Sequence, residues 1–325
     1  MMKYCVAIRT LGTAGEKYQI LLDSLNRQTI KPQKIFVYIP YGYELPKETI
    51  GWEEYVRCPK GMITQRSLSF EEIDTEYILF CDDDLWLADD FVEKLYQGLV
   101  ENNGDCIAPD VFKVQDLSFI GKLKKAIAGY AFPRRDDGWA FKVMRNASYT
   151  YNIHPSKTVL PSESAAFACM LIKKAAYKAI HYEDERWMED FGYALGDDLL
   201  FFYKLHIMGF RVLVHYDVGI KHLDAGAGHS TYSREKVIKE IALSYAVSHR
   251  IKSNLHNNTQ WENFLCYLSY YARFLEQWVF TLVKELLSNH RIVFSAYPKG
   301  LWFGFRYVRS ERYRLIPAFD AYIDN

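Results

Sequence analysis

Short apolar runs alternate with amphipathic stretches over the first 115 residues of the chain. The apolar runs are rich in Val, Ile, Tyr and Phe, which favours strands, and they lie at 4–8, 34–39, 53–58 and 76–81. Apolar residues spaced by three and four predict helices at 18–25, 64–74 and 89–100. This alternation of strand and helix predicts an α/β fold with a mainly parallel sheet flanked by helices.

Beyond residue 115 the pattern of apolar and polar residues changes more than once. Residues 116–160 lose the periodicity and carry charge clusters, so we expect an excursion over the sheet. The pattern then predicts a strand turning into a helix at 163–182, a helix at 196–210 and a return to the sheet at 211–223. Long helical patterns follow, at 234–251 and 260–287. We therefore predict a catalytic domain at 1–230 and a helical region at 231–325.

Composition and charge exclude several classes of protein. Lys and Arg together number 40, as do Asp and Glu, so the chain lacks the basic excess of a general nucleic-acid binder. The six cysteines are scattered without metal-binding spacing, which is typical of reduced, buried thiols. Neither a signal peptide nor an apolar run of about 18 residues is apparent. We expect a cytoplasmic protein that is not integral to a membrane.

Three consecutive carboxylates, Asp82, Asp83 and Asp84, follow the apolar run at 76–81 directly. They lie within about 7 Å of extended chain and repel one another unless positive charge lies close by. A divalent cation with oxygen ligands provides that charge, at the strand end where open α/β sheets bind their ligands. The alternative is an acidic turn that caps the next segment.

Several segments, in this order, resemble a family 2 glycosyltransferase of the GT-A type. The passage SLNRQTIKPQKIFV (24–37) resembles the family's SLxxQTxxPxxIxV pattern, and Asp82 with Asp84 resembles its DxD motif. GDDLLFFYKLHIMGF (196–210) resembles the family's acidic pair and following helix, and VGIKH ends at His222 as the family's later histidine does. The resemblance covers roughly residues 3–225. It implies a Rossmann-like mixed, mainly parallel sheet with a C-terminal helical extension.

The resemblance also implies a donor, a metal and a base. The donor is a nucleotide-diphosphate sugar, and the expected donor-binding residues are Thr10, Gly12, Arg66, Asp82 and Asp83. For Arg66 a solvated helix face, and for Thr10 and Gly12 plain loop structure, are the alternatives.

The expected metal ligands are Asp82, Asp84 and His222, which suit Mn²⁺ or Mg²⁺. A histidine that ends a strand in a hydrogen bond is the alternative for His222. We expect Asp198, or second Asp197, to take the proton from the acceptor, although either can simply cap a helix. Attack opposite the leaving group implies inversion at the anomeric carbon.

Two departures from the family pattern concern the nucleotide side. The acidic residue usual after the second strand is replaced by IPYGYE, and the proline usual before Thr10 is replaced by Arg9. We expect neither change to touch the metal site.

The C-terminal region adds a membrane hypothesis. The helix at 261–287 is apolar on more than one stripe, so we expect it to be covered on two sides. The sequence from residue 284 onward contains seven Lys or Arg but only four Asp or Glu, together with several aromatic residues. This composition suits an anionic membrane surface. YPKGLWFGFRY (297–307) also resembles the tail of glycosyltransferases that build lipid-linked surface polysaccharides. We therefore expect a glycan or lipid-linked glycan acceptor at the inner membrane face.

Two other functions fit parts of the sequence. Phosphatases of the haloacid dehalogenase type also carry DxD after a strand, and GDD at 196–198 could imitate their later motif. Their motif normally lies on the first strand, whereas three strands precede Asp82 here. A non-catalytic carbohydrate-binding protein on the same fold is the other alternative, and the intact acidic residues argue against it.

Overall fold

The structure is a computed structural model of the chain. It describes residues 2–111, 118, 133–134, 136–192, 194–223, 233–255, 259–286 and 292–323.

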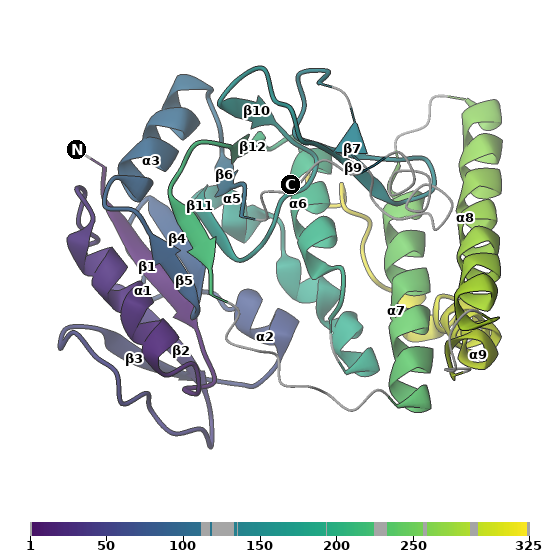
Figure 1. The fold of residues 1–325 in the computed structure, drawn as a ribbon, viewed down its shortest axis with the longest axis horizontal. Helices are drawn as coiled ribbons and strands as arrows, with labels where there is room; N and C mark the ends of the chain where they lie inside the picture. The colour runs from purple at the N-terminus through teal and green to yellow at the C-terminus, as the bar shows by residue number, and fades with distance from the viewer. Residues whose placement is uncertain are drawn as a thin grey trace.

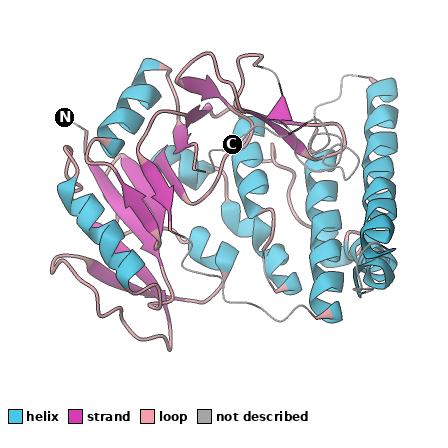
Figure 2. Cartoon of the chain, viewed as in Figure 1, coloured by secondary structure: helices cyan, strands magenta, loops and turns pink. Residues whose placement is uncertain are grey.

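A mixed, mainly parallel sheet forms the centre of the molecule (Figures 1 and 2). Its strand order is β10-β12-β6-β11-β4-β1-β2-β3. Neighbours are parallel except that β11 runs antiparallel to β4 and β6, and β10 antiparallel to β12. The expected fold class is confirmed. The strands are β1 (Tyr4–Arg9), β2 (Ile35–Pro40), β3 (Glu54–Cys58), β4 (Tyr77–Asp82), β6 (Cys106–Pro109), β10 (Val159–Pro161), β11 (Cys169–Lys173) and β12 (Val212–His215).

Both faces of the sheet are covered, which explains why its strands read as continuous apolar runs. Alternate residues of β1 enter two separate hydrophobic clusters, with Cys5 and Ala7 in one and Val6 and Ile8 in the other. Helices α1 (Glu16–Arg27) and α3 (Phe91–Glu101) pack on the Val6 side. Helices α2 (Met62–Arg66), α5 (Lys174–Ala179) and α6 (Asp197–Ile207) pack on the other side (Figure 1).

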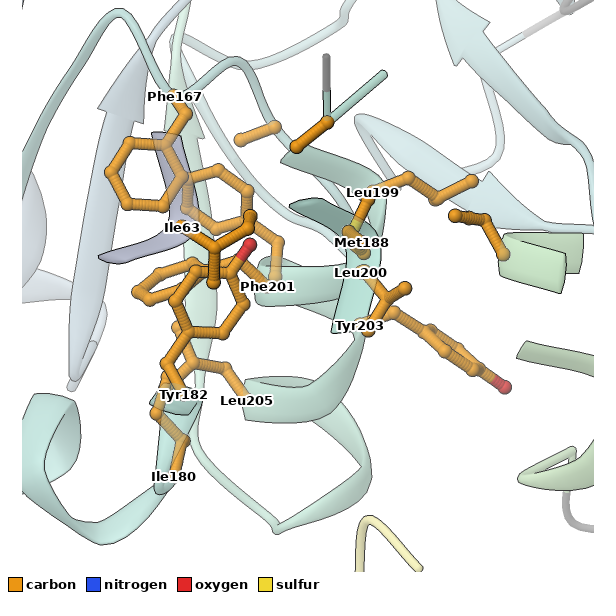
Figure 3. Close-up of a cluster of buried hydrophobic side chains, with 14 of the residues drawn as sticks. Ile63, Phe167, Ile180, Tyr182, Met188, Leu199, Leu200, Phe201, Tyr203 and Leu205 are labelled. Atoms are coloured by element: carbon orange, nitrogen blue, oxygen red, sulfur yellow. The ribbon is translucent and has the colours of Figure 1, made fainter. Parts of the chain in front are cut away.

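Helix α6 is fixed by a group of buried aromatic rings (Figure 3). The ring of Phe201 lies 4.5 Å from that of Phe167 and 4.9 Å from that of Tyr182, both in edge-to-face geometry. Aromatic pairs of this kind add roughly 0.5–1.5 kcal/mol each beyond the area that they bury. The packing therefore holds the first turn of α6, which carries the GDD sequence, in a defined place.

Two predicted elements differ from the structure. The helix expected at 64–74 is shorter in the structure, where α2 ends at Arg66, and Phe70 further along adopts φ 48° and buries its ring against Tyr38, Phe80 and Tyr177. A left-handed backbone at that position cannot continue an α-helix.

The segment expected to return to the sheet at 211–223 divides between two sheets. Strand β12 joins the main sheet, whereas β13 (Ile220–His222) pairs antiparallel with β5 (Leu85–Leu87) in a separate two-stranded sheet.

The excursion at 116–160 lies partly outside the described residues. Its described part contains a small sheet of β7 (Pro133–Arg134), β8 (Phe141–Val143) and β9 (Tyr149–Asn152). Strands β8 and β9 pair antiparallel, with Phe141 opposite Tyr151 and Val143 opposite Tyr149. Phe141, Tyr149 and Tyr151 of this hairpin line a cavity.

The C-terminal region is helical in its described part, as predicted. It contains α7 (Arg234–Ser253), α8 (Gln260–Leu286), α9 (Ile292–Tyr307) and α10 (Glu311–Arg314). Helix α9 approaches α7 closely because two of its contacts are glycines. A Cβ atom at Gly300 would lie 2.6 Å from the Ile241 side chain, and one at Gly304 would lie 2.8 Å from the carbonyl oxygen of Ala242. In the described part of the chain, no helix has the length and apolar character that a bilayer span requires.

Helix α8 is covered on one side, which differs from the expectation of cover on two. Tyr270 and Phe274 are buried against Tyr245 of α7. A second apolar stripe is exposed to solvent along the length of the helix. Its exposed members are Trp261, Phe264, Leu268, Tyr271, Leu275, Val279 and Leu286.

Candidate active site

A cavity of about 1510 Å³ lies at the carboxyl ends of β1 and β4 and extends to α6, α7 and α8. Eight predicted site residues from five separate segments line it, which is the arrangement expected of ligand sites in open α/β sheets. They are Thr10, Arg66, Asp82, Asp83, Asp84, Asp197, Asp198 and His222.

Asp83 is fixed at the end of β4 by a neighbouring strand. The hydroxyl of Thr10, itself 4% exposed at the end of β1, donates a hydrogen bond to Asp83 Oδ2. Burial raises the pKa of Asp83 to about 6, and the neighbouring carboxylates of Asp82 and Asp84 act in the same direction. The hydrogen bond from Thr10 opposes this rise.

Asp84 and His222 meet because β13 pairs with β5. The register places His222 opposite Leu85, the residue after Asp84, and the backbone N–H of Leu223 donates to the carbonyl oxygen of Asp84 at 2.8 Å. His222 Nε2 consequently lies 3.4 Å from Asp84 Oδ1. The side chain of Asp84 is 10% exposed and lines the cavity with His222.

A carboxylate and an imidazole at this spacing fit a divalent cation such as Mn²⁺. Within the described residues, however, His, Cys, Asp and Glu form no group of three or more that could hold a metal ion. The pair therefore fits as a two-ligand site that substrate phosphates and water would complete, as is usual for Mg²⁺ bound to phosphorylated substrates.

Asp82, the third expected ligand, is paired with Arg9. These two residues end neighbouring parallel strands in direct register, and Arg9 Nη2 forms an ion pair with Asp82 Oδ1. The expectation that Arg9 would leave the metal site untouched is therefore wrong. The charge of Arg9, placed on a strand that ends beside the acidic triplet, was the signal in the sequence that could have revealed this contact.

Arg66 is buried in a network of carboxylates, so the alternative of a solvated helix face is wrong. Its guanidinium forms an ion pair with Asp197 and lies 3.6 Å from Asp198 Oδ1 and 3.9 Å from Asp82 Oδ1. It also lies over the Phe167 ring, 4.1 Å from the centroid. Burial lowers the pKa of Arg66, and the nearby charge of Arg9 acts in the same direction.

Asp197 and Asp198 occupy different environments at the start of α6. Asp197 is 3% exposed and turned toward Arg66, whereas the side chain of Asp198 is 41% exposed at the cavity. The N-cap position belongs to Gly196, with φ 89° and no side-chain hydrogen bond, so neither aspartate caps the helix as the alternative supposed. Desolvation raises the pKa of Asp198, while Arg66 opposes the rise.

Gly12 does not line the cavity, although it was expected to bind the donor. Its backbone has φ 76°, and a Cβ atom there would lie 2.5 Å from the carbonyl oxygen of Glu44. Its N–H donates to Thr10 Oγ1 at 2.9 Å. Gly12 therefore supports Thr10, and a direct contact with the donor stays a prediction.

Sequence reasoning missed the cavity wall opposite the acidic residues. Phe141, Tyr149 and Tyr151 of the β8–β9 hairpin and Arg273 of α8 all line it. The alternation in YTYN at 149–152 was a signal for a strand, but it lies inside a region without wider periodicity. Glu163 and Trp187 do not line the cavity. Glu163 instead accepts a hydrogen bond from the Val143 N–H at 2.6 Å, which holds β8 in place.

The family resemblance is supported by a direct match. Residues 54–177 match the model of the glycosyl transferase family 2. The matched segment runs from β3 to α5 and contains Arg66 and the acidic triplet, whereas Thr10, Asp198 and His222 lie outside it.

Comparison of structures finds a more distant likeness. A crystal structure of GalNAc-T7 with UDP, GalNAc and Mn²⁺ aligns at a TM-score of 0.43 and 11% sequence identity. The alignment covers 90% of this chain and 58% of that one. No curated protein matches the sequence.

Proposed function

We propose that this protein is an inverting, metal-dependent glycosyltransferase of the hexosyltransferase type. It would move a sugar from a nucleotide-diphosphate sugar to a hydroxyl of a glycan or lipid-linked glycan. One observation carries the proposal. The cavity holds the Asp84–His222 pair and the half-exposed Asp198 together, in a chain whose residues 54–177 match the model of the glycosyl transferase family 2.

The donor side of the proposed reaction uses the acidic triplet. When bound, Mn²⁺ or Mg²⁺ would act as a Lewis acid that absorbs negative charge on the departing diphosphate. Asp84 and His222 would hold the ion, with Asp82 contributing through water. Thr10 and Arg66 would shape the donor pocket by fixing the carboxylates of Asp83 and Asp82.

The acceptor side uses Asp198. Its carboxylate reaches the cavity, and its raised pKa brings it closer to the pH at which a general base is most effective. Asp197 is a poorer candidate because it is buried against Arg66. A base that faces the donor from the side opposite the diphosphate favours inversion at the anomeric carbon.

The exposed residues of the C-terminal helices indicate that the proposed acceptor lies at a membrane surface. Helix α8 exposes its apolar stripe, and α9 exposes Trp302 and Phe303 together with Lys299 and Arg306, followed by the exposed Arg309. Exposed aromatic residues beside cations are complementary to an anionic lipid surface. We place the protein in the cytoplasm at the inner membrane face, in cell-surface polysaccharide synthesis. The full chain should sediment with phosphatidylglycerol liposomes at low salt, and failure to do so rules the membrane contact out.

A panel of nucleotide sugars with Mn²⁺ tests the activity. Slow release of nucleoside diphosphate from one member supports a transferase, and its absence with every member contradicts the proposal. Release of phosphate from phosphomonoesters would instead support the phosphatase. Release of neither nucleoside diphosphate nor phosphate would favour a carbohydrate-binding protein.

A pair of variants tests the metal assignment. Asp84→Asn should abolish metal-dependent binding of the active donor, because it removes one ligand charge from the site. Asp89→Asn, at a side chain 63% exposed on the surface, is the matched control and should bind normally. Equal binding by both variants would show that Asp84 does not hold the metal.

A further inference from the structure

The wall of the cavity opposite the acidic residues is aromatic. The Phe141 ring lies 5.8 Å from the Tyr149 ring and 6.2 Å from the Tyr151 ring, both tilted. The antiparallel register of β8 and β9 places Phe141 directly opposite Tyr151 and brings all three rings to the cavity. Phe141 and Tyr149 are half-buried, so part of each ring is available to a ligand.

The hairpin is fastened to the C-terminal helices by Arg273. Its Nη1 donates to the carbonyl oxygen of Asn146 and to Ser248 Oγ, each at 3.1 Å. The turn itself is closed by a hydrogen bond from Ser148 Oγ to Asn146 Oδ1 at 2.6 Å. These contacts join β9, α7 and α8 around one end of the cavity and fix the aromatic wall before any ligand binds.

The aromatic wall faces the proposed base. Burial raises the pKa of Tyr149, and the negative charge of Asp198 adds to the rise, whereas Arg273 opposes it. The Tyr149 phenol therefore lies within electrostatic range of both the Asp198 carboxylate and the Arg273 guanidinium. A molecule placed against this wall would have Asp198 within reach.

The cavity has room for two substrates. Its volume of about 1510 Å³ exceeds the roughly 300–1000 Å³ of a usual small-molecule pocket. The acidic triplet follows β4 and His222 ends β13, whereas other lining residues belong to the hairpin, α7 and α8, and Figure 1 shows β9, α7 and α8 apart from β4. A donor bound at the triplet would leave the space beside the aromatic wall for the acceptor.

We propose that Phe141, Tyr149 and Tyr151 form an acceptor subsite that takes a sugar ring of a glycan. This inference rests on the proposed glycosyltransferase function and identifies the residues of that site that would hold the acceptor sugar. The C–H face of a pyranose packs on an aromatic face through dispersion and weak C–H contacts, while its hydroxyls stay free to hydrogen-bond. The tyrosine hydroxyls add polar partners at the edges of the rings.

The polar residues between the rings favour a sugar over a lipid chain. Ser148 and Asn152 on the hairpin and Ser244 and Ser248 on α7 also line the cavity. An acyl chain against these groups would remove them from water without offering hydrogen bonds. The lipid part of a lipid-linked acceptor would therefore lie elsewhere, and the subsite would hold the sugar next to the hydroxyl that reacts.

A binding experiment tests the subsite without relying on turnover. Saturation-transfer NMR would be recorded on the full chain with methyl glycosides of glucose, galactose, N-acetylglucosamine and rhamnose. We expect at least one glycoside to receive saturation at its ring protons. Tyr149→Ala should reduce this signal several-fold, whereas Tyr149→Phe should retain most of it because the ring face remains. Tyr41→Ala is the matched control, since Tyr41 is 66% exposed and lies outside the cavity.

The same signals also show whether the glycoside occupies the donor end. They should survive Asp84→Asn, because the metal pair lies in another part of the cavity. No signal with any glycoside, an unchanged signal in Tyr149→Ala, or loss of the signal in Asp84→Asn would each overturn the inference.

Kinetics separate the subsite from the proposed function. With an active donor, Tyr149→Ala should raise the acceptor KM by about two- to tenfold, the equivalent of roughly 0.5–1.5 kcal/mol for one aromatic contact. Hydrolysis of the donor without acceptor should keep its rate and its donor KM. A rise in the donor KM alone would overturn the subsite. Absence of any donor turnover in the wild type, with glycoside signals intact, would refute the transferase while supporting the sugar subsite.

Discussion

Arg9 and Asp82 form an ion pair at the ends of two neighbouring parallel strands. Their side chains are 13% and 26% exposed, so water weakens the interaction only in part. The chain thereby brings positive charge of its own into the acidic cluster, in addition to the buried Arg66. Part of the repulsion among the carboxylates is relieved before any cation binds.

Removal of Arg9 should therefore strengthen metal binding in the absence of donor. In Arg9→Met the site loses one positive charge close to Asp82, which is worth about 1 kcal/mol or more at this range. We expect the Kd for Mn²⁺ to fall by about fivefold or more, measured by titration calorimetry. Arg27→Met, at a side chain 49% exposed in a surface ion pair, is the control. Weaker Mn²⁺ binding in Arg9→Met would show that Arg9 serves the site mainly by orienting Asp82.

Substitution of the two aspartates of α6 should have different effects, a loss of turnover for Asp198 and a loss of stability for Asp197. Asp198→Asn should lower kcat by about 10²–10⁴-fold and leave the donor KM close to normal, because a neutral amide cannot accept the proton. Asp197→Asn should instead lower stability, since it leaves the buried Arg66 without its closest counter-charge. Turnover and thermal unfolding of both variants, with the exposed Asp74→Asn as control, would show the difference. Normal kcat in Asp198→Asn would exclude it as the base.

Gly12 should tolerate substitution less well than Gly42. Both have a positive φ, 76° and 81°, so alanine is strained by about 1–2 kcal/mol at either position. Only at Gly12 does the added Cβ meet backbone, at 2.5 Å from the Glu44 oxygen, while nothing lies within 4 Å at Gly42. Denaturant unfolding should show a larger loss for Gly12→Ala, by about 1–3 kcal/mol. Equal losses would mean that the loop holding Glu44 moves away freely.

Glu185 should be essential to the packing of the 3₁₀ helix η1 (Tyr182–Phe191) and α6 against the C-terminal helix α7. It is fully buried in η1, and Arg250 of α7 donates to both of its oxygens at 2.7 and 3.2 Å. Lys204 of α6 lies 3.6 Å away. Glu185→Gln leaves Arg250 without its charged partner and leaves Lys204 with Asp184 alone, so we expect a loss of about 3–5 kcal/mol in unfolding free energy.

The exposed Glu183→Gln, in the same 3₁₀ helix, is the control for Glu185 and should change stability by less than about 0.5 kcal/mol. A loss of similar size in both variants would show that the buried charge is not the cause.

Stability should fall as the pH drops below about 6.5, in part because of His249. Burial lowers the pKa of His249 from 6.5 to about 4, and the neighbouring cations Lys252, Arg309 and Arg250 act in the same direction. The unfolded chain therefore binds a proton at this residue between pH 6.5 and 4 while the folded chain does not, which favours unfolding as the pH falls. Melting temperatures of wild type and His249→Gln should converge over this range. The exposed His154→Gln should keep the wild-type slope.

The fold could be predicted largely because its signal is local. Strands β1, β2 and β4 occur within one residue of their predicted bounds, since their apolar runs are buried on both sides of the sheet. The edge strand β3, which is only partly buried, also begins within one residue of its predicted start. The helix after β3 was predicted too long, since α2 ends at Arg66 and the left-handed conformation of Phe70, whose ring fills the core, prevents a helix from reaching residue 74. That preference comes from packing among distant residues, which local periodicity does not report.

By itself the sequence determined where the charged groups stand along the chain: the triplet after β4, the acidic pair at the start of α6 and His222 in β13. The tertiary structure alone decided which of them meet. His222 reaches Asp84 because β13 pairs with β5, Arg66 is buried because Phe167 and the carboxylates surround it, and Asp82 is paired because β1 and β4 end in register. Electrostatic energies depend on distance and on exclusion of water, and folding sets both of these for residues far apart in sequence.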